Sequence, residues 1–335
     1  MRAPTDDGNP VTRWTAADIP PLEGRIAVVT GANSGLGFAT AKALAQHGAL
    51  VVMGCRDATR AKAAAELIVE QVPGAVLDPR VLDLADLDSV RSFAQALGTR
   101  YDAVDLLVNN AGVMAPPVRA ETSQGFELQF GTNHLGHFAL TGLLLPILLA
   151  APRARVVTVS SFAHEPGRMS FDDLQCERGY TPYGAYSQSK LANLLFMQEF
   201  DRRLKSAGAE AISVGAHPGF ANTNLQAAGP FLGSNPLSSK LVLGGVRLIG
   251  QSAERGAEPQ LYAATAPDVK GGDYYGPKHR IAGPSAISTM SPRARDQADA
   301  ARLWEISAKL TGVDIDTALE RSTGPASTEE SLDGA

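Results

Sequence analysis

Two short segments of this 335-residue chain carry residue types that could move a hydride and a proton. Tyr186 and Lys190 stand four residues apart, which places a phenol and an ammonium on one face of a helix. Residues 30–37 read TGANSGLG and lie between an apolar run and an expected helix. Together the two segments predict hydride and proton transfer between a nicotinamide dinucleotide and a carbonyl or an alcohol.

The glycine turn at 30–37 is the expected cradle for the dinucleotide pyrophosphate. Glycine lets the backbone approach phosphate oxygens, and a helix start offers unpaired N–H groups. The alternative is a tight connection between a strand and a helix that binds no ligand. The residues of this turn expected to contact the dinucleotide are Gly31, Asn33, Ser34, Gly35, Leu36 and Gly37.

The spacing of Tyr186 and Lys190 bears on the pKa of the phenol. A free tyrosine has a pKa of about 10 and is a poor base at neutral pH. An ammonium about 4 Å away, at an effective dielectric constant of ~20, is worth roughly 4 kcal/mol or about 3 pKa units. We therefore expect Lys190 to lower the phenol pKa, although a lone Tyr-x3-Lys pair also occurs by chance in many helices. Ser161 could orient a carbonyl oxygen, or it could cap a strand end together with Ser160.

The end of the second expected strand predicts which dinucleotide binds. An acidic residue there would bind the ribose 2′-hydroxyl of NAD(H) and repel the 2′-phosphate of NADP(H). The chain instead reads Gly54-Cys55-Arg56, with no carboxylate before Asp57. Arg56 offers planar donors to a phosphate, so NADP(H) is favoured; the alternative is a solvated arginine at a strand end.

The composition excludes several classes of partner. The net charge of −5 lies at the two ends: residues 1–24 hold two arginines against four carboxylates, and residues 320–335 hold one against four. The neutral remainder argues against a nucleic-acid partner. Two cysteines are too few for a disulfide framework, and residues 1–24 carry no basic-then-apolar signal. The longest apolar run, residues 143–151, is far shorter than the ~20 residues of a membrane span, so we expect no span and a cytoplasmic protein.

Two histidines give a weak signal for a metal. His134 and His137 stand three residues apart on an expected helix, but no cysteine or carboxylate cluster completes a ligand set. The sequence therefore predicts no metal site, with one of these histidines in the core and the other on the surface.

Apolar runs alternate with helical stretches from residue 25 onward. Strands that are apolar on both faces and alternate with helices predict an α/β fold, in which helices cover both faces of a single doubly wound, Rossmann-type parallel sheet. The expected strands lie near 26–30, 50–53, up to 82, 105–108, 155–159 and 211–214, and the expected helices run up to 47, over 58–71, 87–97 and 124–150, and up to 205.

We expect one domain over residues 23–315. Residues 1–22 and 316–335 are polar and are expected to form an N-terminal arm and a flexible C-terminal tail. Residues 221–252 are rich in Gly, Ser and Leu and follow the sixth strand at the sheet edge where ligands bind in open α/β folds. We expect them to form a lid over a lipophilic substrate; alternatively, their leucines pack on the core or on a partner subunit.

These motifs resemble those of the short-chain dehydrogenase/reductase family over about residues 22–315. The turn at 30–37 is similar to the family's cofactor motif, and Asn109-Asn110-Ala111-Gly112 resembles its fourth-strand signature. The resemblance assigns the catalytic tetrad to Asn133, Ser161, Tyr186 and Lys190. It assigns further contacts with the dinucleotide to Asp83, Leu84, Asn110, Ala111, Gly112, Tyr186, Lys190, Pro218, Gly219 and Thr223.

Three further segments are similar to the branch that contains retinol dehydrogenases, WW-domain oxidoreductases and protochlorophyllide reductases. They are CRD at 55–57, TNHLGHF at 132–138 and VSS at 159–161. Two departures matter: residues 1–24 cannot span a membrane as the anchor of the retinol enzymes does, and Ser34 stands where NADP-dependent members often have a basic residue. Arg56 would then carry the preference for NADP(H) alone.

The resemblance also implies a mechanism and an architecture. Tyr186 would exchange a proton with the substrate oxygen, while Lys190 lowers the phenol pKa and holds the nicotinamide ribose. Ser161 would polarise the substrate oxygen, and Asn133 would position a water that relays protons. The implied sheet has about seven strands in the order 3-2-1-4-5-6-7, and the chain would form a homodimer or homotetramer. Two alternative functions are a non-catalytic NADP-binding redox sensor and a reductase of a conjugated carbon–carbon double bond.

Overall fold

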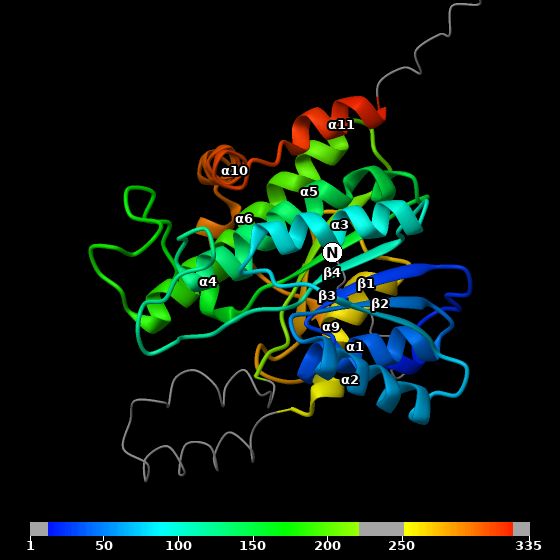
Figure 1. The fold of residues 1–335 in the computed structure, drawn as a ribbon. Helices are drawn as coiled ribbons and strands as arrows, with labels where there is room; N and C mark the ends of the chain where they lie inside the picture. Colours follow the sequence, from blue (N-terminus) through cyan, green and yellow to red (C-terminus); the bar gives the residue numbers. More distant parts are fainter. Residues whose placement is uncertain (1–12, 221–250, 324–335) are drawn as a thin grey trace, which may run out of the picture.

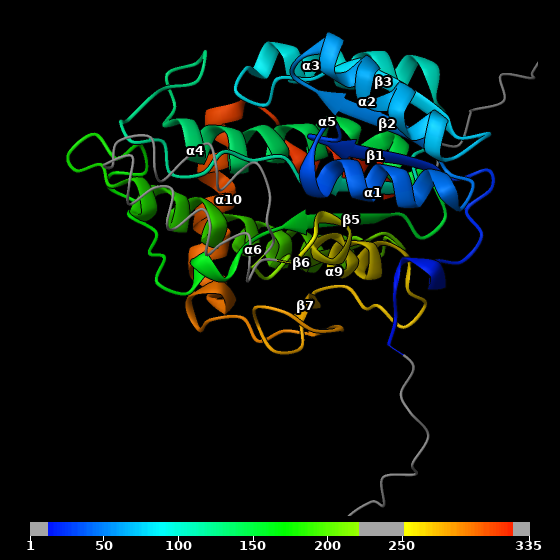
Figure 2. The same cartoon turned by 90° about the horizontal axis from the view of Figure 1, so that it is seen from below.

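The computed structural model describes residues 13–220 and 251–323, and every structural statement below concerns these residues. They form one sheet of eight strands in the order β3-β2-β1-β4-β5-β6-β7-β8 (Figures 1 and 2). The strands are β1 (Ile26–Thr30), β2 (Leu50–Cys55), β3 (Val76–Val81), β4 (Leu106–Asn109), β5 (Arg155–Val159), β6 (Ile212–Ala216), β7 (Tyr274–Pro277) and β8 (Ser285–Ile287).

Helices cover both faces of the sheet, with α1, α2 and α9 on one face and α3, α5 and α6 on the other (Figure 1). The α-helices are α1 (Gly35–Gln46), α2 (Ala58–Gln71), α3 (Leu87–Arg100), α4 (Leu128–Phe130), α5 (Gly136–Leu149), α6 (Pro182–Ser206), α9 (Ala253–Thr265), α10 (Gln297–Thr311) and α11 (Ile315–Thr323). The shorter turns are η1 (Ala16–Asp18), the π-helical η2 (Gly131–Leu135), η3 (Phe162–His164) and η4 (Arg293–Arg295).

The expected doubly wound parallel sheet and its strand order are confirmed. Strands β1 to β7 pair in parallel, and adjacent residues of one strand serve opposite cores: Val28 packs with the α3 and α5 side, and Val29 with the α1 and α9 side. The count differs by one strand because β8 folds back antiparallel on β7, pairing Tyr275 with Ile287. Three residues with no apolar alternation carry too weak a strand signal to be predicted from sequence.

The expected long helix at 124–150 is present, but it begins later and is interrupted. The helical stretch runs over Leu128–Leu149 and contains a π-helical turn at Gly131–Leu135, which carries Asn133. By length and composition this helix could cross a membrane, a possibility that the apolar run at 143–151 alone did not reveal. In this fold 78% of its most apolar window is buried inside the protein.

The N-terminal boundary expected at residue 23 is wrong. Arg13 pairs with Glu258 of α9 at 2.7 Å, and the ring of Trp14 lies edge-on to Tyr262, with 5.1 Å between ring centres. Ile19 is also buried in the core. The mainly polar composition of residues 1–22 outweighs these few apolar residues in the sequence pattern. Their contacts form only when α9 lies beside them.

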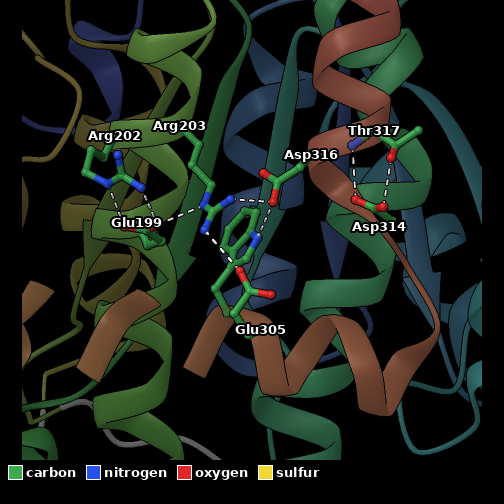
Figure 3. A network of polar contacts seen from close by, with 8 residues as sticks. Glu199, Arg202, Arg203, Glu305, Asp314, Asp316 and Thr317 are labelled. Atoms are coloured by element: carbon green, nitrogen blue, oxygen red, sulfur yellow. Dashed lines mark hydrogen bonds and ion pairs between the residues drawn. The ribbon is translucent and has the colours of Figure 1, made fainter. Parts of the chain in front are cut away.

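The C-terminal boundary expected at residue 315 is also wrong, because α11 continues to Thr323 and packs on α5. Helix α10 places Trp304 against the rings of Phe138 and Phe196, and the indole N–H donates to Asp316 of α11 at 3.2 Å. Figure 3 shows Arg203 of α6 reaching the same carboxylate as well as Glu199 of its own helix. The C-terminal helices are therefore tied to the long helix that carries Tyr186 and Lys190.

We expect Trp304→Ala to lower the free energy of unfolding by about 3–5 kcal/mol, because it leaves a cavity among buried aromatic rings. The neighbouring Glu305→Ala is the matched control, since the Glu305 side chain is 74% exposed and its ion pair with Arg203 is long, at 3.6 Å. Its effect should stay within about 0.5 kcal/mol. Urea unfolding followed by circular dichroism measures both, and equal losses would contradict the packing role assigned to Trp304.

Candidate active site

The glycine turn leaves the carboxyl end of β1 and enters α1 with little room to spare. Gly31 and Gly35 adopt φ values of +68° and +55°, which favour glycine. A Cβ on Gly37 would lie 2.3 Å from the carbonyl oxygen of Gly31. The start of α1 therefore presses directly on the turn, and its first N–H groups face the carboxyl edge of the sheet, as an anionic ligand requires.

A cavity of about 470 Å³ runs along this edge. Its lining includes these residues expected from sequence: Gly31, Asn33, Ser34, Gly35, Leu36, Gly37, Arg56, Asp83, Leu84, Asn110, Ala111 and Gly112. It also includes residues that the sequence analysis missed as ligand contacts: Gly54, Asp57, Arg60, Leu82, Val113, Met114, Pro116, Leu128 and Thr132. A glycine turn at the start of a helix, with no room for a Cβ at Gly37, fits the pyrophosphate of a dinucleotide.

The end of β2 brings a second arginine to the cavity. Asp57 caps α2 by accepting from the backbone N–H of Arg60 at 3.0 Å, which places Arg60 in the first turn of α2, whereas Arg56 precedes the helix. The available sequence signal was a second arginine close after Arg56 at the start of the expected helix. The thiol of Cys55 instead points beneath the glycine turn, where burial raises its pKa to about 11.

Tyr186 and Lys190 are both buried, with 6% and 3% of their surface exposed. The Lys190 ammonium lies 5.8 Å from the centre of the Tyr186 ring and donates to the carbonyl of Val159 at 3.2 Å. Burial raises the pKa of Tyr186 to about 12, while a hydrogen bond with Ser161 lowers it in part. Burial also lowers the pKa of Lys190 to about 8.

The expectation that Lys190 lowers the phenol pKa is thus wrong for this geometry. Removing both side chains from water disfavours the charged form of each, and the Lys190 ammonium donates to the carbonyl of Val159. An ammonium about 4 Å from the phenol oxygen would lower the phenol pKa in a partly hydrated setting, but spacing alone does not include the water that both side chains lose on burial.

The two hydroxyls at the end of β5 have different partners. Ser160 Oγ donates to the carbonyl of Lys190 at 2.7 Å, so it ties β5 to α6. Ser161 Oγ accepts from the N–H of Ala163 at 3.2 Å and hydrogen-bonds to Tyr186. Ser161 therefore both caps η3 and hydrogen-bonds to the phenol, while its orienting of a carbonyl oxygen stays a prediction.

Asn133 is fully buried in the π-helical turn η2. Its amide nitrogen donates to the carbonyl of Val113 at 2.9 Å and to Ser189 Oγ at 2.9 Å, and its Oδ1 accepts from the N–H of Val113 at 2.8 Å. A Cβ on Gly112 would lie 3.0 Å from this Oδ1 and 3.6 Å from Lys190 Nζ. Asn133, Gly112 and Lys190 are therefore in contact range, and both amide protons of Asn133 are already used.

Other predicted contacts lie apart from the cavity lining or outside the described residues. Gly219 has φ +66° and donates its N–H to His217 Nδ1 at 3.2 Å, just beyond Pro218 and the end of β6. Thr223 and nearly all of the expected lid at 221–252 lie outside the described residues.

Within the described ranges, no group of three or more His, Cys, Asp or Glu side chains could hold a metal ion. The expected surface position for one histidine of the pair is wrong, because His134 and His137 are each only 1% exposed. His134 lies in η2 and His137 in α5, and the rest of the fold covers both elements.

Comparison with known proteins identifies the family. The family model described as short chain dehydrogenase matches residues 25–229, which is more than half of the chain. The chain belongs to the short-chain dehydrogenase family. Retinol dehydrogenase 13 of Homo sapiens is 40% identical over 305 residues, covering 90% of this chain and 88% of that protein. Retinol dehydrogenase 14 of Mus musculus is also 40% identical, covering 87% of each.

Solved structures agree with this short-chain dehydrogenase assignment. An uncharacterised protein from Mycobacterium paratuberculosis is 44% identical with a TM-score of 0.75, covering 91% of this chain and 99% of that chain. A protein from Beutenbergia cavernae, described as a candidate NAD(P)-dependent gluconate 5-dehydrogenase with bound NADP, is 26% identical with a TM-score of 0.60, covering 76% of this chain and 95% of that chain. As a short-chain dehydrogenase, this chain is an oxidoreductase that acts on alcohols or carbonyls.

We expect Gly37→Ala to weaken binding of a nicotinamide dinucleotide at least tenfold, because the new methyl group must displace the carbonyl of Gly31. The same clash should cost about 1–3 kcal/mol of stability. Gly98→Ala is the matched control, since a Cβ on Gly98 of α3 meets nothing within 4 Å. It should leave binding unchanged and stabilise the helix by up to about 1 kcal/mol. Fluorescence titration and thermal unfolding report the two effects, and unchanged binding by Gly37→Ala would remove the turn from the site.

Proposed function

We propose that this short-chain dehydrogenase interconverts a carbonyl and an alcohol on a lipophilic small molecule, using NADP(H), with Tyr186 as the general acid and base. The observation that carries the proposal is the buried phenol of Tyr186, hydrogen-bonded to Ser161 and one helical turn from Lys190. Ser161 caps η3, just after β5, and Lys190 belongs to α6, so two elements bring these side chains together beside the phenol.

The protonation state of Tyr186 supports donation of a proton. Because burial raises its pKa to about 12, the phenol is neutral at physiological pH and holds the proton that a reduced carbonyl needs. A bound nicotinamide dinucleotide supplies or accepts the hydride. As negative charge develops on the carbonyl oxygen, Tyr186 donates its proton to that oxygen, and in the reverse direction it takes the proton back. Ser161 donates a second hydrogen bond to the same oxygen.

Lys190 and Asn133 support this transfer from behind the phenol. A pKa of about 8 leaves the Lys190 ammonium mostly charged at neutral pH, and its hydrogen bond to the carbonyl of Val159 holds that charge one helical turn from the phenol. Asn133 holds the backbone of Val113 through both its amide nitrogen and its Oδ1. These two hydrogen bonds keep the neighbouring Gly112 against the Lys190 side chain.

The preference for NADP(H) rests on two guanidinium groups. Arg56 and Arg60 both line the cavity beyond β2, and the nearest carboxylate, Asp57, already accepts from the first turn of α2. A 2′-phosphate could therefore meet two sets of planar donors. Arg60 adds a cation to the one that the sequence analysis had assigned, and so makes up for the uncharged Ser34 in the turn.

The proposal of a lipophilic substrate rests on the relatives named retinol dehydrogenases and on two exposed apolar side chains, one before Tyr186 on α6 and one beside Gly219. Tyr183 lies one turn before Tyr186 and is 54% exposed, and Ile281 is 53% exposed. The carbonyl of Ile281 accepts from the N–H of Phe220, just after Gly219. These side chains offer an apolar surface at the carboxyl edge of the sheet, where a substrate would approach.

We expect Tyr186→Phe to reduce carbonyl reduction by about 10²–10⁴-fold, since the proton donor is lost while the ring remains. NADPH affinity should change less than about threefold. Tyr262→Phe is the matched control, because it removes a phenolic hydroxyl on the surface of α9 that bonds to Asp268 and should keep near-normal rates. NADPH consumption with aldehydes, ketones and quinones of graded size measures turnover, and fluorescence titration measures binding.

Two outcomes would contradict this mechanism. Retention of most activity by Tyr186→Phe would show that another group transfers the proton. NADPH binding without consumption by the unaltered protein, for every carbonyl and conjugated alkene tried, would favour a redox sensor.

Arg56→Ala and Arg60→Ala should each weaken NADPH binding while sparing NADH. A charge-assisted hydrogen bond is worth roughly 1.5–3 kcal/mol, so the loss should be about 10- to 150-fold for the arginine that contacts the 2′-phosphate. Lys62→Ala is the matched control, because Lys62 is an exposed cation on the same helix outside the cavity lining. An unchanged ratio of the two dissociation constants in both arginine variants would exclude these residues from the cofactor site.

A further inference from the structure

The hydroxyl of Thr30 is a junction between the two strands that flank the cavity. It ends β1, directly before the glycine turn, and Oγ1 accepts from the backbone N–H groups of Asn110 and Ala111, each at 2.9 Å. The amide nitrogen of Asn110 also donates to the carbonyl of Thr30 at 2.7 Å. Because both lone pairs of Oγ1 are used by these donors, its own proton must go to a further acceptor.

The nearest acceptor is the ring of His137. His137 Nε2 lies 2.9 Å from Thr30 Oγ1, whereas the carbonyl of Val108 lies 3.4 Å away. At its other side, His137 Nδ1 lies 3.0 Å from the carbonyl of Asn133, which can only accept. The proton of a neutral ring therefore resides on Nδ1, and Nε2 accepts from Thr30. Burial lowers the pKa of His137 to about 4, so the ring is neutral at physiological pH.

His137 consequently joins two halves of the site that the proposed reaction must hold together. On one side Thr30 precedes the glycine turn and anchors Asn110 and Ala111, which line the cavity. On the other side the π-helical turn carries Asn133, which contacts Val113 and lies beside Gly112 and Lys190. The ring of His137 hydrogen-bonds directly to the Thr30 hydroxyl through one nitrogen and to the Asn133 carbonyl through the other.

We infer that His137 is a positioning residue: through Thr30 and the Asn133 carbonyl it sets the distance between the cofactor turn and the proton-transfer groups. The inference rests on the proposed function of Tyr186 and Lys190. It assigns His137 no contact with substrate or cofactor. A misplacement of about 1 Å can cost on the order of 10²-fold in rate when two reactants must meet at a fixed distance.

His134 provides a matched control on the same helical stretch. It is as buried as His137, but its Nε2 lies 2.7 Å from Ser307 Oγ of α10, and its ring packs against Phe130 and Phe138. Its contacts therefore hold the C-terminal helix and do not reach the cofactor turn. A purely structural role for His137 would make the two histidines behave alike.

The test compares His137→Asn with His134→Asn in the full chain. Asparagine at 137 can still donate to the Asn133 carbonyl but is too short to reach Thr30. For His137→Asn we expect kcat to fall at least tenfold, and NADPH affinity to change less than threefold. The primary isotope effect with 4-deuterated NADPH should rise, because hydride transfer itself is slowed. For His134→Asn we expect a lower melting temperature with kcat and the isotope effect near normal.

Hydrogen exchange gives a second readout that needs no turnover. In His137→Asn, amides of peptides covering residues 108–113 should exchange faster, because Thr30 has lost its acceptor; in His134→Asn they should stay protected. His137→Gln serves if the asparagine variant does not fold, since its longer amide can accept from Thr30 but cannot reproduce both bonds.

Equal losses of kcat in the two histidine variants, with an unchanged isotope effect, would overturn the positioning role. Unchanged exchange over 108–113 in folded His137→Asn would overturn it too. These outcomes are distinct from failure of the proposed function, which would appear as activity retained by Tyr186→Phe.

Discussion

The cavity of this protein exists because strands β1 and β4 are neighbours in the sheet but lead into elements on opposite faces. β1 is followed by α1 on one face, and β4 by the segment that leads to α5 on the other, so a crevice opens at their carboxyl ends. A single hydroxyl, that of Thr30, closes the base of this crevice by accepting from Asn110 and Ala111. The glycine turn begins at Gly31, directly after Thr30. Asn110 and Ala111 of the cavity lining donate to the Thr30 hydroxyl, so the turn and the lining both depend on this junction.

Loss of water determines the chemistry available above this junction. Tyr186 and Lys190 are buried on α6 between β5 and the C-terminal helices, and burial pushes the pKa of each toward its neutral form. A neutral phenol next to a marginally charged amine is suited to giving up a proton when negative charge develops nearby, and less suited to acting as a permanent base. The hydrogen bond from Ser161 lowers the phenol pKa and so reverses part of the upward shift that burial causes.

The long helix that carries these groups is held from outside the sheet. Trp304 and the carboxylate of Asp316 fix α10 and α11 against α6 through the guanidinium of Arg203, whose carbon lies 4.5 Å from the indole ring centre. The helix is thereby clamped between the sheet on one side and an aromatic cluster on the other. Residues near the end of the chain are thus part of the scaffold of the site.

The sequence by itself determined the parallel sheet, the glycine turn and the family, because each rests on local patterns that need few neighbours. Apolar runs bounded by helical stretches define β1 to β6, and the spacing of glycines defines the turn whatever surrounds it. Arg60 was within reach of the same reasoning, since it lies four residues after Arg56 in the first turn of the expected helix. The structure alone decided features that depend on distant partners. Strand β8 requires β7 beside it, the contacts of Arg13 and Trp14 require α9, and α11 requires α5 to pack on. The direction of the Tyr186 pKa shift and the two partners of His137 were equally inaccessible, because spacing along a chain records neither the water lost on burial nor which groups the fold brings within hydrogen-bond distance.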